Sequence, residues 1–189
     1  MEINFKKIIE ESQASIDKDD LEILLPIIAK IQPKNILEIG AWKGYSAEVW
    51  IKALAPEKFI TIELQDRKDL LPLSNFFISD DRILDQGYQY WYGTDSHDKD
   101  VLRSVELAMP SVDFLFIDGD HSYYGVEKDF DMYAGLVRKG GIIAFHDALY
   151  HADKTEEVDL YWDYRFRKKY NYVEIKAGKN STGIGVIWV

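Results

Sequence analysis

Apolar residues alternate along the chain between two patterns. Short continuous apolar runs predict strands at residues 35–40, 58–64, 88–93, 112–118 and 141–147. Between these runs, apolar residues recur at helical spacing and predict helices at residues 45–55, 66–77, 100–109 and from Val126 onward. Continuously apolar strands that alternate with helices are typical of a parallel sheet covered on both faces. The sequence therefore predicts an α/β fold.

The two ends of the chain depart from this alternation. Residues 3–16 and 20–31 are predicted helices, which Pro33 ends, so we expect an N-terminal helical extension over 1–33 before a domain over 34–189. After a predicted helix at about 156–169, two apolar stretches flank a short polar turn that contains glycine. This arrangement predicts a terminal antiparallel hairpin.

The predicted helix that starts near Val126 carries a stop signal at its end. Arg138 and Lys139 stand in the expected last turn, and Gly140 follows them. Cations at a helix C-terminus followed by glycine are a common helix ending. We therefore expect this helix to end at Arg138–Gly140, with the next strand starting at Gly141.

Composition and charge narrow the class of protein. The 189 residues carry a formal net charge of −10 and no cysteine. An acidic chain is a poor partner for nucleic acid or for anionic membranes, and disulfides and thiolate metal sites are excluded. The start "MEINFKKIIEESQ" lacks a signal-peptide pattern, and no segment approaches the length of a membrane span. We expect a cytoplasmic protein.

Every predicted strand ends in an acid or a histidine. In an open α/β sheet, ligands bind beyond the carboxyl ends of the strands, so these residues are the candidate site. They are Glu38-Ile39-Gly40, Glu63, Gly93-Thr94-Asp95-Ser96, Asp118-Gly119-Asp120-His121 and His146-Asp147.

The first of these loops, "EIGAWKGYS", has two glycines that allow a sharp turn and close approach of a ligand. A dinucleotide fold would have a second glycine where Trp42 stands, so the pyrophosphate interpretation is weakened. Glu63 can accept hydrogen bonds from both ribose hydroxyls, and Glu38 could face a cationic ammonium group, directly or through water. The alternative is a tight strand–helix turn and a solvated acid.

Five stretches together resemble one enzyme family: "ILEIGAWKGYS", "ITIEL", "GTDS", "VDFLFIDGDHSYYGVEKDF" and "LVRKGGIIAFHD". They are similar to the class I S-adenosylmethionine-dependent methyltransferases, in the branch of macrolide-sugar and cephalosporin-hydroxylase-like small-molecule O-methyltransferases. The resemblance covers about residues 34–150 and the hairpin. It implies a Rossmann-like fold with a seven-stranded, mostly parallel sheet, a terminal antiparallel hairpin and helices on both faces.

The resemblance also implies a cofactor, an acceptor and a set of contacts. The expected activity is O-methylation of a small hydroxylated metabolite, with the N-terminal helices covering the cofactor or forming a homo-oligomer contact. The expected S-adenosylmethionine-binding residues are Glu38, Gly40, Ala41, Trp42, Gly44, Ser46, Glu63, Asp95, Ser96, Asp118, Gly119 and Asp120.

Metal-dependent members of this group bind a divalent ion such as Mg²⁺ or Mn²⁺ at positions that match Asp118, His146 and Asp147. A divalent ion held by oxygen ligands can lower the pKa of a substrate hydroxyl. The family prefers an acid or amide where His146 stands, and imidazole suits Mn, Fe or Zn better than Mg. Alternatively, His146 and Asp147 only cap the strand.

His121 matches the position of the general base in the macrolide-sugar enzymes, and imidazole can accept a proton at neutral pH. The alternative is a histidine satisfied by the turn that opens a helix at Ser122. Asp120 either orients His121 or binds the cofactor. Asp95 and Ser96 lie beside the adenine in the resembling family, or cap a helix from about Asp98, and we expect His97 to be a solvated loop residue.

Two rival functions remain. A cofactor-binding regulator or assembly subunit without transferase activity would share the fold, because a fold does not fix a function. An NAD-dependent oxidoreductase is disfavoured by Trp42 and by the terminal hairpin.

Overall fold

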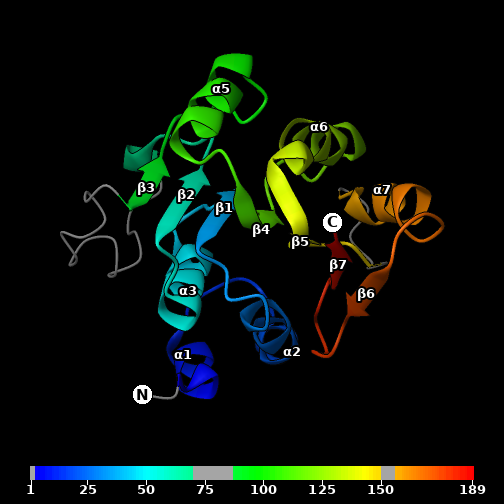
Figure 1. Cartoon of the computed structure of the whole chain (residues 1–189). Helices are drawn as coiled ribbons and strands as arrows, with labels where there is room; N and C mark the ends of the chain where they lie inside the picture. Colours follow the sequence, from blue (N-terminus) through cyan, green and yellow to red (C-terminus); the bar gives the residue numbers. More distant parts are fainter. Residues whose placement is uncertain (1–2, 70–86, 150–155) are drawn as a thin grey trace.

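The computed structural model describes residues 3–69, 87–149 and 156–189. In this part of the chain, one sheet has the strand order β3-β2-β1-β4-β5-β7-β6 (Figure 1). Strands β1 to β5 are parallel, whereas β7 runs antiparallel to both of its neighbours. The strands are β1 (Asn35–Ile39), β2 (Lys58–Ile62), β3 (Tyr88–Trp91), β4 (Val112–Ile117), β5 (Val137–Phe145), β6 (Tyr172–Ile175) and β7 (Ile184–Trp188).

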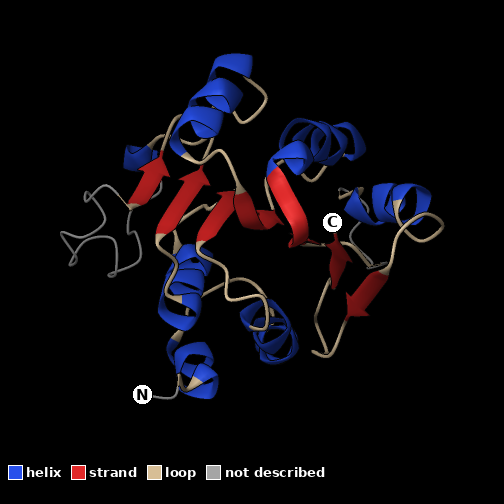
Figure 2. Ribbon diagram, in the orientation of Figure 1, coloured by secondary structure: helices blue, strands red, loops and turns tan. Residues whose placement is uncertain are grey.

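Helices cover both faces of the sheet, as Figure 2 shows. One face is covered by α1 (Phe5–Glu11), α2 (Lys18–Ala29) and α3 (Tyr45–Leu54). The other is covered by α5 (Lys99–Ala108), α6 (Tyr123–Tyr133) and α7 (Val158–Arg165). The predicted fold class is therefore confirmed. Within the described ranges, every helix is too short or too polar to span a bilayer.

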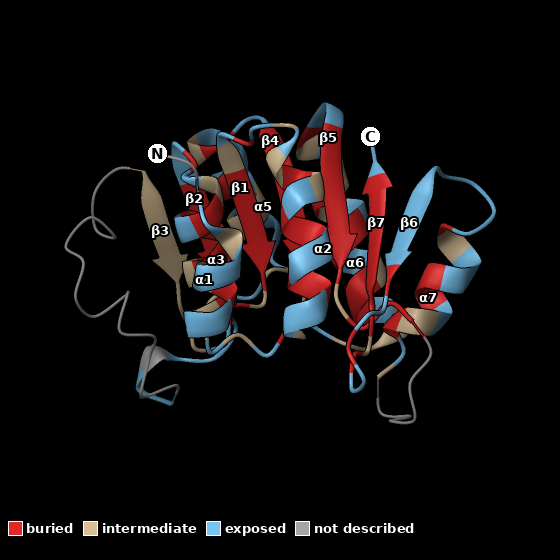
Figure 3. Cartoon of the chain, turned by 90° about the horizontal axis from the view of Figure 1, so that it is seen from below, coloured by how far each residue is buried: buried red, intermediate tan, exposed pale blue. Residues whose placement is uncertain are grey.

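The core consists of two buried layers, one on each side of the central strands (Figure 3). Side chains of a strand point alternately to opposite faces. Leu37 accordingly packs toward α5 and α6, whereas Ile36 packs toward α2 and α3. On the second side, the Trp50 ring of α3 meets Phe114 and Phe116 edge-on, at centroid distances of 5.5 and 5.1 Å. Burial on both faces explains why β1 and β4 are continuously apolar.

The predicted stop at Arg138–Gly140 is wrong, because helix α6 ends earlier. It ends at Tyr133, a short 3-10 turn follows at Ala134–Leu136, and β5 already begins at Val137. Val137 pairs with Val112 of β4, and the Arg138 guanidinium contacts the Asp113 carboxylate. Arg138 therefore stabilises a contact between two strands and does not end a helix.

The other element boundaries need smaller corrections. The first predicted helix, 3–16, ends at Glu11, where the Ser12 backbone N–H turns back to the Ile9 carbonyl. Of the predicted helix 66–77, only a 3-10 turn at Arg67–Asp69 is described, and residues 70–77 lie outside the described residues.

Asp20 connects α2 to the loop between β6 and β7. Its buried carboxylate accepts hydrogen bonds from the backbone N–H groups of Ala177, at 2.6 Å, and Gly178, at 3.4 Å. It also accepts from the Ser181 hydroxyl. No cation neutralises Asp20 among the described residues, so the three donors stabilise its charge. The N-terminal helices are thereby held against the hairpin.

Candidate active site

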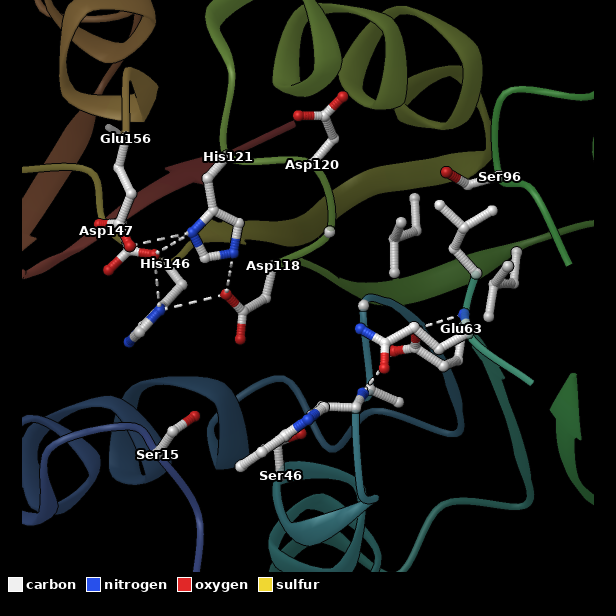
Figure 4. Close-up of a pocket in the computed structure, with 18 of the residues that line it drawn as sticks. Ser15, Ser46, Glu63, Ser96, Asp118, Asp120, His121, His146, Asp147 and Glu156 are labelled. Atoms are coloured by element: carbon white, nitrogen blue, oxygen red, sulfur yellow. Dashed lines mark hydrogen bonds and ion pairs between the residues drawn. The ribbon is translucent and has the colours of Figure 1, made fainter. Parts of the chain in front are cut away.

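A cleft of about 780 Å³ opens at the carboxyl ends of the parallel strands (Figure 4). Its size is that of a typical small-molecule site. Every expected cofactor-binding residue except Glu38 and Gly44 lies in its wall. The lining residues from the strand-end loops are Ile39–Trp42, Tyr45, Ser46, Ile62–Gln65, Thr94–His97, Asp118–His121, His146 and Asp147. Residues Ser15, Asp17, Glu156, Asn180, Ser181 and Thr182 complete it.

The loop after β1 turns through left-handed backbone conformations. Gly40 and Gly44 have φ values of +83° and +80°, and Trp42 has a φ of +46°. A Cβ atom added to Gly40 would lie 1.9 Å from the Asp118 carbonyl oxygen, so the two loops touch backbone to backbone. Only glycine fits this position. Gly44, which precedes α3, provides the second bend.

Glu63 is buried at the end of β2 and holds two loops. One carboxylate oxygen accepts from the Trp42 backbone N–H at 2.6 Å, and the other accepts from the Gln65 N–H at 2.8 Å. Each oxygen retains a second lone pair. Glu63 could therefore still accept hydrogen bonds from the hydroxyls of a ligand.

Glu38 lies behind the cleft wall rather than in it. It is fully buried, and its two oxygens accept hydrogen bonds from the Trp50 indole and the Thr61 hydroxyl, both at 2.8 Å. Burial raises the pKa of Glu38 to about 7, although these bonds and one from Ser46 act against the shift. Ser46 lines the cleft and hydrogen-bonds to Glu38 behind it. Glu38 therefore does not contact a ligand ammonium group directly in this geometry.

Two histidines and three carboxylates meet at one end of the cleft (Figure 4). His146 Nδ1 lies 3.1 Å from both Asp118 Oδ1 and Asp147 Oδ2. His121 Nδ1 lies 3.0 Å from Asp147 Oδ2 and 3.4 Å from Glu156 Oε1, and its Nε2 lies 3.5 Å from Asp118 Oδ1. The structure thus brings together the predicted base and the three predicted metal ligands.

The groups of this cluster shift one another's pKa values. A hydrogen bond to Asp147 raises the pKa of His121 to about 9, against the opposing effect of burial. Burial disfavours the charged form of His146, yet Asp118 and Asp147 hold its pKa well above the ordinary value. Burial also opposes ionisation of Asp147, but the two neighbouring imidazoles, His121 first, hold its pKa well below the ordinary range. In the absence of a metal ion, the neighbouring carboxylates therefore favour the cationic form of both imidazoles.

Ligand atoms of Asp118, His121 and Asp147 lie within 4.8 Å of one another, which could place them around one metal ion. The geometry therefore adds His121 to the carboxylates as a candidate ligand, beside His146. The Nδ1 atom of His146 is buried and lacks hydrogen-bond geometry to either neighbour. Carboxylate oxygen and imidazole nitrogen together suit Mn, Fe or Zn.

Sequence reasoning missed Glu156. It stands just before α7, where the backbone N–H of Glu157 donates to the His121 carbonyl at 2.8 Å. The Glu157 carboxylate in turn accepts from the Tyr123 N–H at 3.0 Å. The available signal was the acidic pair before "VDLYW", but no motif connects that pair to His121. Asp120, in contrast, turns back on its own loop and accepts from the Ser122 N–H at 2.9 Å.

At the opposite end of the cleft, the loop after β3 packs against α6 (Figure 4). The Ser96 hydroxyl donates to Asp129 Oδ1 at 2.8 Å, and the Ser96 carbonyl accepts from the Tyr133 hydroxyl at 2.7 Å. His97 Nε2 lies 3.2 Å from the same Asp129 oxygen, and its side chain is only 18% exposed. The prediction of a solvated His97 is therefore wrong, because the imidazole packs beside Asp129, which is distant in sequence. Asp98, rather than Asp95 or Ser96, caps α5.

The fold is Rossmann-like, and the cleft lies beyond the carboxyl ends of the strands, where ligands bind in such folds. A family model described as a methyltransferase domain matches residues 37–148, and the chain belongs to this methyltransferase domain family.

Two solved structures share the fold. One is the O-methyltransferase TomG from Streptomyces achromogenes, which is involved in tomaymycin synthesis and was solved with S-adenosylmethionine. It is 16% identical, with a TM-score of 0.66 over 99% of this chain and 86% of its own. The other is an O-methyltransferase from Bacillus cereus in complex with S-adenosylhomocysteine. It is 18% identical, with a TM-score of 0.63 over 98% of this chain and 90% of its own.

A curated relative matches only part of the chain. It is the uncharacterized protein R132 of Acanthamoeba polyphaga mimivirus, which is 42% identical over 52 residues. The match spans 28% of this chain and 24% of that protein.

Proposed function

We propose that the chain is an S-adenosylmethionine-dependent O-methyltransferase that acts on a small hydroxylated acceptor. The observation that carries this proposal is a single cleft with cofactor-type loops along its wall and a histidine–carboxylate cluster at one end. Membership of the methyltransferase domain family supports it. A regulator that only binds the cofactor would have no use for the cluster.

The charge of the cleft fits this cofactor. Among the described lining residues, seven are carboxylates and none is lysine or arginine: Asp17, Glu63, Asp95, Asp118, Asp120, Asp147 and Glu156. S-adenosylmethionine carries a positive sulfonium and no phosphate, whereas NAD carries a diphosphate that such a wall would repel. The carboxylates therefore favour the methyl donor over a dinucleotide.

The donor set also fits a divalent cation. Asp118 and Asp147 would hold it through oxygen, with His146 or His121 supplying nitrogen. When bound, such an ion lowers the pKa of a coordinated hydroxyl.

The protein's own part in the reaction is to bring the acceptor and the methyl group together, and most of the rate would come from this positioning. Asp147 and Glu156 both face Nδ1 of His121 and hold the imidazole. His121 can act as a base only in its neutral form, which a cation held by Asp118, His146 and Asp147 would favour over the protonated one. In that form, Nε2 of His121 would take the proton from the acceptor hydroxyl as its oxygen attacks the methyl carbon.

Calorimetry with S-adenosylhomocysteine tests the proposal, with and without Mg²⁺ or Mn²⁺. We expect binding by the wild type, a change in binding with the ion, and no binding of NAD. His121→Ala should keep cofactor affinity and lose methyl transfer. Failure to bind S-adenosylhomocysteine would overturn the whole proposal, whereas binding that ignores metal would overturn only its metal part.

A further inference from the structure

The start of helix α7 contacts the loop that carries His121 at three points. The backbone N–H of Glu157 donates to the His121 carbonyl at 2.8 Å. The Glu157 carboxylate accepts from the Tyr123 N–H at 3.0 Å. The third contact is on the imidazole itself, where Glu156 Oε1 lies 3.4 Å from Nδ1 of His121 (Figure 4). Two consecutive residues therefore contact both the backbone and the ring of one histidine.

The loop has hydrogen bonds of its own that begin α6 without Glu157. Ser122 caps the helix by accepting from the Gly125 N–H at 3.1 Å, and Asp120 accepts from the Ser122 N–H at 2.9 Å. Such acceptors are what the first N–H groups of a helix need. Glu157 is exposed, so water could satisfy the Tyr123 N–H in its place. The contribution of Glu157 is therefore mainly geometric, because it fixes the loop against α7.

Helix α7 is a firm support for this contact. Its Tyr161 and Trp162 side chains are buried, and the Tyr161 ring meets the Tyr123 ring edge-on at a centroid distance of 5.3 Å. The Glu157 carbonyl accepts from the Tyr161 N–H at 3.2 Å, which joins Glu157 to the helix. A group on a packed helix is placed more precisely than a group on a loop. Glu157 can therefore set the position of the loop that it contacts.

The imidazole of His121 needs a fixed position because its two nitrogens have different neighbours. Asp147 and Glu156 face Nδ1, whereas Asp118 faces Nε2. The side chain is 35% exposed, so packing alone does not hold the ring. A displacement of about 1 Å at a reacting group can cost about 100-fold in rate. The loop that carries the ring must therefore be held as firmly as the strands that carry the carboxylates.

We propose that Glu157 is a positioning residue for His121, which acts through the backbone of the loop and not on the ring. Its N–H group and its carboxylate hold the loop on both sides of Ser122, while Glu156 restrains the ring. The use of the imidazole as a base or metal ligand rests on the proposed function. The contacts of Glu157 with the loop do not depend on it.

The first test follows the ring signals of His121 by NMR in the full chain with ¹⁵N-labelled histidine. Their loss in His121→Asn identifies them. Glu157→Ala should shift these signals toward the values of a free imidazole. Glu157→Gln should leave them unchanged, because its amide oxygen can still accept from the Tyr123 N–H. Asp159→Ala is the matched control on the same helix and should also leave them unchanged, since Asp159 accepts from the Leu160 N–H of α7 itself.

The second test measures Mn²⁺ affinity by calorimetry. Glu157→Ala should weaken Mn²⁺ binding by about tenfold, the size typical of losing a group that orients a metal ligand. Glu157→Gln and Asp159→Ala should bind Mn²⁺ as the wild type does. S-adenosylhomocysteine should bind all four proteins equally, because Glu156 lines the cleft and Glu157 stands behind it. A general loss of structure would weaken both ligands.

Unchanged ring signals in Glu157→Ala would overturn the proposal, as would equal shifts in Glu157→Ala and Asp159→Ala. Should Glu157→Ala not fold, Glu157→Asp gives the answer. Glu157 is the N-cap residue of α7, where aspartate is favoured, but the shorter side chain should lose the Tyr123 contact and shift the signals. If the wild type does not bind S-adenosylhomocysteine, the proposed function fails, and without Mn²⁺ binding its metal part fails. In either case the ring signals alone decide whether Glu157 positions His121.

Discussion

At the scale of single residues, Gly40 and Gly93 form a matched pair of left-handed glycines. Gly40 has a φ of +83° and a Cβ there would meet backbone at 1.9 Å, whereas Gly93 has a φ of +59° with nothing within 4 Å. Gly93→Ala should lower the free energy of unfolding by about 1 kcal/mol, because alanine is placed in a left-handed conformation. Gly40→Ala must also separate two loops, and should cost more than about 3 kcal/mol in urea unfolding. Equal losses would contradict the backbone contact.

Glu38 should make stability depend on pH. Its pKa rises from 4.5 to about 7 on folding, so the folded state holds the proton more tightly. The resulting stabilisation is complete below about pH 4.5 and is lost as the pH rises through 7.

Glu38→Gln keeps the contacts to Trp50 and Thr61 without the charge. Near pH 4 the variant should match the wild type, and at pH 8 it should be more stable by about 3 kcal/mol. Glu22→Gln, on an exposed position of α2, should change neither value. Chemical unfolding across this pH range measures both, and parallel curves for Glu38→Gln and wild type would rule out the effect.

At the scale of elements, the contact between α2 and the β6–β7 loop depends on Asp20. Asp20→Ala leaves three donors without their acceptor, and should lower the free energy of unfolding by about 2–4 kcal/mol. Asp19→Ala, exposed on the same helix, should cost only a few tenths of a kcal/mol. Hydrogen exchange at the Ala177 N–H should accelerate in the first variant and remain slow in the second.

How far sequence predicts an element depends on where its stabilising contacts lie. The strands at 35–40 and 112–118 were predictable, because burial on both faces makes them continuously apolar. The start of β5 was not, since Arg138 is placed by Asp113, which is 25 residues away in sequence. The local pattern of two cations and a glycine indicates a helix end. In the structure, however, Arg138 contacts the distant Asp113 carboxylate and belongs to strand β5.

The same limit applies to the candidate site. The strand-end rule brought Asp118, His121, His146 and Asp147 to one edge, and the structure places them in contact. Glu156 could not be predicted, because it precedes a helix rather than ending a strand. Residues from the N-terminal extension and the hairpin loop also reach the cleft, and only tertiary packing brings them there.

At the scale of the whole molecule, charge should govern cofactor binding. The chain has a net charge of −10, and the cleft wall is acidic. S-adenosylmethionine carries one more positive charge than S-adenosylhomocysteine, so salt should weaken its binding more. Between about 50 mM and 1 M NaCl, we expect the affinity ratio to fall by about fivefold. Titration calorimetry measures it, and equal salt slopes for both ligands would contradict an electrostatic contribution from the wall.

Helix α6 connects the two ends of the cleft. It starts immediately after His121 and Ser122, and it carries Asp129, which holds Ser96 and lies beside His97. An α-helix advances 1.5 Å and turns 100° per residue, so inserting or deleting one residue between His121 and Asp129 would turn the carboxylate away from its partners. The number of residues in this span therefore fixes how the His121 cluster at one end of the cleft is placed relative to Ser96 at the other.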